Sequence, residues 1–186
     1  MTSNNLARFS QRMAAVTLVL IVVMLVFNAA LWLFPVIAGK NGWGLGFALT
    51  DRQLSNIADK AQMFPWWQTL GGIVLSSIPL VALAIGLGHL RRLFKSYARG
   101  EYFSSDAARS LGSVGKAVGI WVLLDLMCEP LLSVWVTMTE PVGQRMISLS
   151  IMAPSFVALF LAACISIIAH ILWHASEINS ENRTFV

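Results

Sequence analysis

The chain has 186 residues, of which 57% are hydrophobic and only 12% are charged. A soluble domain carries roughly 25% charged residues, so this composition excludes an ordinary soluble enzyme, a disordered chain, a nucleic-acid-binding domain and a disulfide-stapled secreted module. The net charge is +4, from 13 Lys and Arg against 9 Asp and Glu, and these charges cluster between long uncharged stretches. The sequence therefore indicates an integral membrane protein.

Four apolar stretches are each long enough to cross a bilayer, which takes about 20 residues of α-helix. They occupy about residues 13–38, 67–90, 114–137 and 149–173. The first is longer than the apolar core of a secretory signal, which has about 7 to 15 residues, so we interpret it as a retained span. We expect a single all-α domain over residues 1–186 with four transmembrane helices.

The basic residues predict the orientation of the spans, because cytoplasmic segments of membrane proteins are enriched in Lys and Arg. With the N-terminus inside, nine basic residues lie on the cytoplasmic side and four on the outer side. The inner set consists of Arg8, Arg12, Arg91, Arg92, Lys95, Arg99, Arg109, Lys116 and Arg183. We therefore expect both termini to be cytoplasmic.

The first outer segment is predicted to contain a short helix. Thr50 followed by Gln53 is a capping box, in which each side chain can satisfy a free backbone N–H at a helix start. Apolar residues then recur at helical spacing, with charged residues around the rest of the turn. We expect about residues 51–62 to lie as an interfacial helix on the outer membrane surface.

The inner segment, residues 91–111, is predicted to form a cytoplasmic helical hairpin between the second and third spans. The second span should continue as helix to about Arg99, because Gly100 can supply the left-handed conformation that ends many helices. Ser104 is a good N-cap for the next helix. Four basic residues of this segment can contact anionic lipid or a cytoplasmic partner protein, or can simply set the topology. They are Arg91, Arg92, Lys95 and Arg99.

This inner segment and the C-terminal tail resemble those of the bacterial membrane proteins classed as domain of unknown function 2975. The matching positions are Arg99, Gly100, Glu101, Phe103 and Ser104 in the loop, and Glu181, Asn182 and Val186 at the end. The resemblance implies a four-span protein of the bacterial inner membrane with no assigned reaction and no catalytic residues to carry over. Members often stand beside small helix-turn-helix regulators, which hints at a signalling role.

The third span contains two acids, Asp125 and Glu129, which are four residues apart and therefore share one helix face. An acid at the bilayer centre costs about 2.5 to 3.5 kcal/mol, so we expect this face to turn toward the other helices. An alternative is that Glu129 already reaches the outer interface.

Polar residues of two other spans lie at a similar depth when the rise per residue is counted from the inner helix ends. They are Asn28 of the first span and Ser76 and Ser77 of the second. Together with Asp125 and Glu129 they predict a buried intramembrane polar cluster. Such a cluster can be a structural hydrogen-bonded core, or a site for a cation, a proton or a small polar ligand.

Gly115 and Gly119 form a small-x-x-x-small pattern near the inner end of the third span. Glycines at this spacing let two helices approach closely. The pattern favours packing within the chain, and the alternative is a homo-oligomer.

The three histidines of the chain permit two metal-binding interpretations. His170, His174 and Glu177 make a stripe along one helix face that could chelate a metal, and His89 and His170 lie at a depth where they could be axial ligands of a haem. The stripe lacks the Glu directly after the first His that a zinc protease needs. Ordinary interfacial histidines fit both patterns, so we predict no metal and no cofactor.

No nucleophile elbow, phosphate loop or paired-aspartate motif occurs in the sequence, so we expect no enzymatic activity. We expect a regulatory, sensory or interaction module that contacts the bilayer and a cytoplasmic partner, without direct nucleic-acid binding. The alternative is a transport-related or proton- or ion-coupled module that uses Asp125 and Glu129. A membrane haem or metal protein is a third possibility that depends on the histidines alone.

Overall fold

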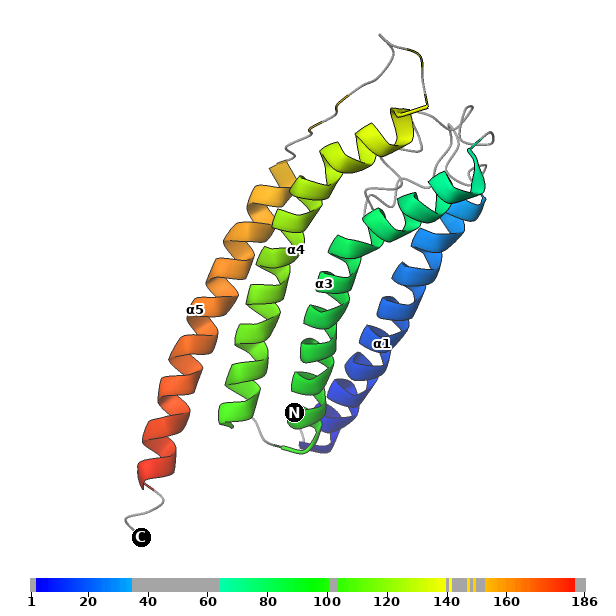
Figure 1. Cartoon of the computed structure of the whole chain (residues 1–186). Helices are drawn as coiled ribbons and strands as arrows, with labels where there is room; N and C mark the ends of the chain where they lie inside the picture. Colours follow the sequence, from blue (N-terminus) through cyan, green and yellow to red (C-terminus); the bar gives the residue numbers. More distant parts are fainter. Residues whose placement is uncertain are drawn as a thin grey trace. The chain divides into compact units, whose positions relative to one another are not determined.

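The computed structural model describes residues 3–34, 64–100, 104–139, 141, 147, 149 and 153–182. They contain four long α-helices, drawn in chain order from blue to red in Figure 1. The helices are α1 (Ser3–Leu33), α3 (Trp66–Ala98), α4 (Ser105–Thr137) and α5 (Ala153–Asn182). Within this part of the chain there is no β-strand.

Each helix is long and apolar enough to cross a membrane. The apolar segments are Ala7–Leu33, Trp66–Ala98, Ser105–Thr137 and Ala153–Ile178. A helix of 33 residues, such as α3 or α4, is about 50 Å long, whereas the hydrocarbon core of a bilayer is about 30 Å thick. The prediction of an all-α protein with four spans is therefore confirmed, and α3 and α4 are long enough to project beyond the hydrocarbon.

The connection between α3 and α4 follows the expectation from the sequence. Helix α3 ends at Ala98, and Gly100 has a φ of 84°, the left-handed conformation that only glycine adopts without strain. The Ser104 hydroxyl accepts a hydrogen bond of 3.2 Å from the Ala107 N–H, which caps the start of α4. The two long helices themselves therefore form the hairpin.

Other expected features lie outside the described residues. The outer interfacial helix over 51–62 is one of them, and so is the last part of the first predicted span, residues 35–38. The orientation of the chain, with both termini in the cytoplasm, stays a prediction.

Burial is inverted relative to a soluble protein. Large apolar side chains such as Val26 and Phe160 are 62% and 69% exposed, as expected where lipid is the solvent. Buried positions instead hold many small and polar side chains, among them Gln68 and Ser76. Because hydrocarbon offers no hydrogen bonds, polar groups on a spanning helix are stabilised only when they face other helices.

The chain forms two compact units, and α1, α3 and α4 contribute to both. The unit that contains the α3–α4 connection consists of Met1–Ile21, Ala82–Ile120 and Ala153–Val186, and we call it the hairpin unit. The other consists of Val22–Val81 and Trp121–Met152, and we call it the carboxylate unit because it contains Asp125 and Glu129 of α4.

Small residues bring the helices of the hairpin unit close together. A methyl group placed on Gly86 of α3 would come within 2.8 Å of the Ala117 Cβ of α4. One placed on Gly115 of α4 would come within 2.9 Å of the Ala162 carbonyl oxygen of α5. These contacts set α3 against α4 and α4 against α5 at close range.

The carboxylate unit has an apolar core in which tryptophans fill the space beside glycines. Leu31 and Trp32 of α1 are buried with residues of α4, namely Cys128, Leu132 and Val136. A methyl group on Gly72 of α3 would overlap the Trp32 ring, and one on Gly71 would overlap the Trp135 ring. Gly71 and Gly72 therefore leave the space that the two indole rings occupy.

We expect Gly72→Ala to lower the free energy of unfolding by about 1–3 kcal/mol, because the added methyl group overlaps the buried Trp32 ring. Gly88→Ala is the matched control, since no described atom lies within 4 Å of the position its methyl group would take. Unfolding in mixed micelles, followed by tryptophan fluorescence, measures both. Equal stability of the two variants would contradict this packing.

Candidate functional site

Asp125 and Glu129 of α4 face the interior of the protein. Asp125 is 9% exposed and Glu129 is 2% exposed, so neither side chain points at lipid or bulk water. They belong to a buried stripe on α4 with the helical spacing of three and four residues. Its members are Val122, Asp125, Cys128, Glu129, Leu132, Ser133, Val136 and Thr137.

The two carboxyl groups differ in how they are satisfied. Asp125 interacts with a neighbouring group. In contrast, Glu129 Oε1 is fully buried and has no hydrogen-bond partner within the described part of the chain. A buried polar atom without a partner costs free energy, so native proteins retain few of them. Glu129 is therefore a buried acid with one oxygen that no described residue satisfies.

Asn28, Ser76 and Ser77 form a hydrogen-bonded cluster between α1 and α3. The Asn28 amide donates to the Ser76 hydroxyl at 3.1 Å and to the Ser77 hydroxyl at 3.2 Å. Trp32 Nε1 also donates to the Ser76 hydroxyl at 3.1 Å, and that hydroxyl in turn donates to the Ile73 carbonyl. The Ser76 oxygen therefore uses its one donor and both acceptor positions.

All five residues of the predicted polar cluster thus lie in the carboxylate unit, and all except Ser77 are buried. The structure joins Asn28, Ser76 and Ser77 directly. Trp32 is a fourth member of that hydrogen-bonded group.

A second polar contact in this unit involves Gln68 in the first turn of α3. Its side-chain amide donates to the carbonyls of Trp135 and Val136, both at 3.0 Å, and Trp135 Nε1 donates to the Gln68 carbonyl at 2.9 Å. The last carbonyls of a helix have no partner within the helix, so Gln68 satisfies two of them at the end of α4. Sequence reasoning missed this residue, although a lone Gln at the start of an apolar span was the signal.

The hairpin unit contains a cavity of about 410 Å³ between α3 and α4, and we call it the basic cavity. Every side chain that lines it is polar: His89, Arg92, Lys95, Ser96, Arg99, Asp106, Arg109, Ser110 and Ser113. Four of these residues are Arg or Lys and one is an acid, so the cavity carries a net charge of about +3 with His89 neutral. Such a site attracts anionic groups.

The basic cavity contains three of the four predicted contact residues, Arg92, Lys95 and Arg99. Arg91 does not line it, and its Nε is buried without a hydrogen-bond partner within the described residues. Sequence reasoning missed His89 and Arg109 as members, because only the fold of the hairpin brings α4 beside this face of α3.

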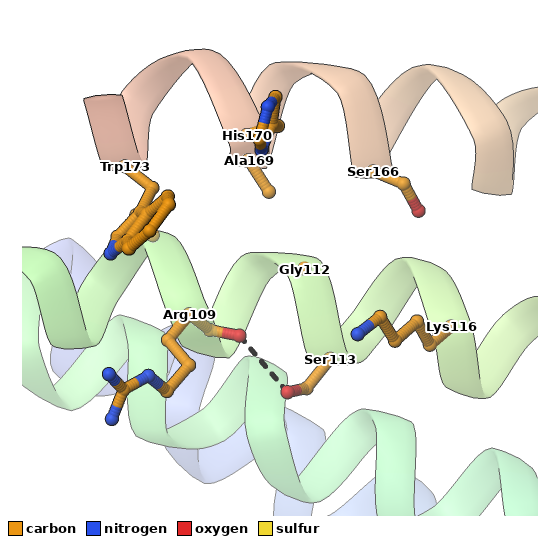
Figure 2. Close-up of a pocket in the computed structure, with 9 residues that line it drawn as sticks. Arg109, Gly112, Ser113, Lys116, Ser166, Ala169, His170 and Trp173 are labelled. Atoms are coloured by element: carbon orange, nitrogen blue, oxygen red, sulfur yellow. Dashed lines mark hydrogen bonds between the residues drawn. The ribbon is translucent and has the colours of Figure 1, made fainter. Parts of the chain in front are cut away.

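A smaller cavity of about 280 Å³ lies between α4 and α5, and we call it the α4–α5 cavity. Figure 2 shows the facing helices, with Ser166, Ala169 and Trp173 directed from α5 toward α4. Arg109 and Ser113 line both cavities, since they lie on the part of α4 between them.

The histidines lie apart from any metal-binding arrangement. His170 and His174 stack edge to face with ring centroids 4.6 Å apart, and His174 Nδ1 lies 3.4 Å from a carboxylate oxygen of Glu177. No group of three or more His, Cys, Asp or Glu residues within the described segments is arranged to hold a metal ion. His89 and His170 line different cavities.

The two glycines of the third span differ in their surroundings. Gly115 packs against α5 of the same chain, where an added methyl group would meet the Ser166 hydroxyl at 2.5 Å. At Gly119 no described atom lies within 4 Å of that position. Gly115 therefore serves internal packing, and a homo-oligomer through this face stays a prediction.

Comparison with known proteins extends the resemblance seen in the sequence. The family described as "Protein of unknown function (DUF2975)" matches residues 47–186, which includes α3, α4 and α5. The chain belongs to the DUF2975 family. Searches of curated proteins and of solved structures gave no match to the chain. The α3–α4 hairpin and all residues that line the two cavities lie within residues 47–186, which the family matches. Asp125 and Glu129 lie there too.

We expect Ser76→Ala to lower the free energy of unfolding by about 1–2 kcal/mol, because it removes the hydrogen bonds that the Ser76 hydroxyl accepts from Trp32 Nε1 and the Asn28 amide. Ser77→Ala is the matched control, since the Ser77 hydroxyl accepts a single hydrogen bond from Asn28 and Ser77 is less buried than Ser76. Detergent unfolding measures both. A loss for Ser77→Ala as large as that for Ser76→Ala would contradict the central role of Ser76.

Proposed function

We propose that this DUF2975 protein is a non-enzymatic membrane module with a regulatory role, and that its basic cavity binds an acidic segment of a cytoplasmic partner protein. The single observation behind the proposal is the grouping of Arg92, Lys95, Arg99 and Arg109 around one cavity. The excess of basic residues at this end of the spans favours a cytoplasmic location for it.

The lining of the basic cavity favours a hydrophilic ligand. Every side chain that lines the cavity ends in a polar group, and four of them are cations. The cavity extends along α3 from His89 to Arg99, about 15 Å at the helical rise, at the end of a helix that exceeds the hydrocarbon thickness. Several separated cations over this length suit a peptide with several carboxylates better than a single small anion.

The double variant Arg92→Gln with Lys95→Gln should weaken binding of a fluorescent hexaglutamate peptide by about tenfold or more, since each cation contributes about 1 kcal/mol. The measurement is fluorescence anisotropy with the full chain in zwitterionic nanodiscs at two salt concentrations. Higher salt should weaken binding to the unchanged protein.

The matched control is Arg8→Gln with Arg12→Gln, which removes the same charge from α1, where neither residue lines the basic cavity. It should weaken binding less than about threefold, because the lost charges lie outside the site. Equal losses in the two double variants would mean that net charge alone attracts the peptide, and would refute the proposed site.

A second candidate function is favoured by Glu129. Its buried carboxyl group has an oxygen without a partner in the described chain, one turn from a second buried acid, Asp125. Ionisable groups inside membrane proteins commonly mark proton or ion pathways. We therefore propose proton or ion coupling through this acid pair as the alternative to the partner-binding role.

If this alternative is correct, Glu129→Gln should abolish proton flux into liposomes that contain the full chain, as read by a pH-sensitive dye. The variant should unfold at a detergent concentration similar to or higher than that of the unchanged protein, because the amide is close in size to the carboxyl group and removes an acid from a buried position. Asp106→Asn, at an exposed acid in the first turn of α4, is the control and should leave flux unchanged. Absence of flux in the unchanged protein, or flux that survives Glu129→Gln, would exclude this function.

A further inference from the structure

The α4–α5 cavity is built from two helix faces that oppose each other. On each helix the lining residues recur at positions i, i+3, i+4 and i+7, the spacing of one continuous face. The faces consist of Arg109, Gly112, Ser113 and Lys116 on α4, and of Ser166, Ala169, His170 and Trp173 on α5. The cavity is therefore a groove along both helices.

Small residues form the middle of this groove. A methyl group on Gly112 would lie 3.5 Å from the Ala169 Cβ, so the two helices are in contact there. Longer polar side chains lie on either side of this contact. At the helical rise, Lys116 is about 10 Å along α4 from Arg109. The groove thus combines a tight apolar floor with basic groups along its length.

The side of α5 that faces away from the groove is apolar and exposed. On α5 the neighbouring side chains Ile167, Ile168 and Ile171 are each more than half exposed. Trp173 contributes an amphipathic ring of the kind found at headgroup level. A ligand that fits here has an anionic head and apolar chains.

This lining distinguishes the two cavities of the hairpin unit. The basic cavity is lined by polar side chains alone, whereas the α4–α5 cavity adds Ala108, Gly112, Ala169 and Trp173 to its polar groups. A free anion gains nothing from the apolar part of the lining, while a lipid uses both parts.

We propose that the α4–α5 cavity binds the headgroup of an anionic phospholipid. Lys116 pairs with the phosphate, and a His170 ring N–H is a donor within the same cavity. The Ser113 and Ser166 hydroxyls also line the cavity, but they donate to the Arg109 and Ala162 carbonyls of their own helices. The acyl chains lie against the apolar part of the same lining, which includes Ala108, Ala169 and Trp173. Basic pockets between spans on the cytoplasmic side commonly hold such headgroups.

The test is native mass spectrometry of the full chain in detergent, titrated separately with phosphatidylglycerol and with phosphatidylcholine of the same acyl chains. The unchanged protein should retain phosphatidylglycerol at least about fivefold more tightly, the contribution of about one basic contact. Lys116→Gln should remove this preference and Lys116→Arg should keep it. Arg12→Gln, which changes the same charge on α1 outside the cavity, should keep it too.

Loss of the preference in Arg12→Gln as well as in Lys116→Gln, or its survival in Lys116→Gln, would overturn the proposal. A further arm uses inorganic phosphate alone: phosphate that displaces phosphatidylglycerol at millimolar concentration would identify a free-anion site instead of a lipid site. Because Lys116 does not line the basic cavity, failure here leaves the peptide-binding proposal standing, and the reverse also holds.

Discussion

The structure depends on one constraint, which is that hydrocarbon supplies no hydrogen bonds to a polar group. Four long helices satisfy the backbone, and polar side chains are then stabilised only where they face another helix. Asp125, Glu129, Asn28 and Gln68 are accordingly buried, while isoleucine, valine and phenylalanine cover the outside. The buried face of each helix is therefore where chemistry can occur, and the exposed face indicates where lipid lies.

Much of this arrangement could be predicted from the sequence, because the relevant signals are local. Long apolar runs predict spans, Gly100 and Ser104 predict the ends of the hairpin helices, and a spacing of four places Asp125 and Glu129 on one face. Each of these needs only the geometry of a single helix or turn.

The remaining features require knowledge of which helix faces meet. Gln68 contacts carbonyls near residue 135, and the indole of Trp32 fills the space beside Gly72, across separations of tens of residues. Arg109 lines both cavities only because α4 packs between α3 and α5 within the hairpin unit. The periodicity of one helix carries no information about such partners, so sequence reasoning found the basic residues of α3 but not the complete cavity.

The helix contacts of this protein are of two kinds, and they resist sliding differently. In the carboxylate unit, α1 is tied to α3 by two hydrogen bonds that the Ser76 oxygen accepts, so a shift of either helix lengthens both bonds. In the hairpin unit, α5 touches α4 through glycine and alanine, whose van der Waals contact has no preferred direction. A change in bilayer thickness will therefore be absorbed by the tilt of α5 rather than by a slip of α1 along α3.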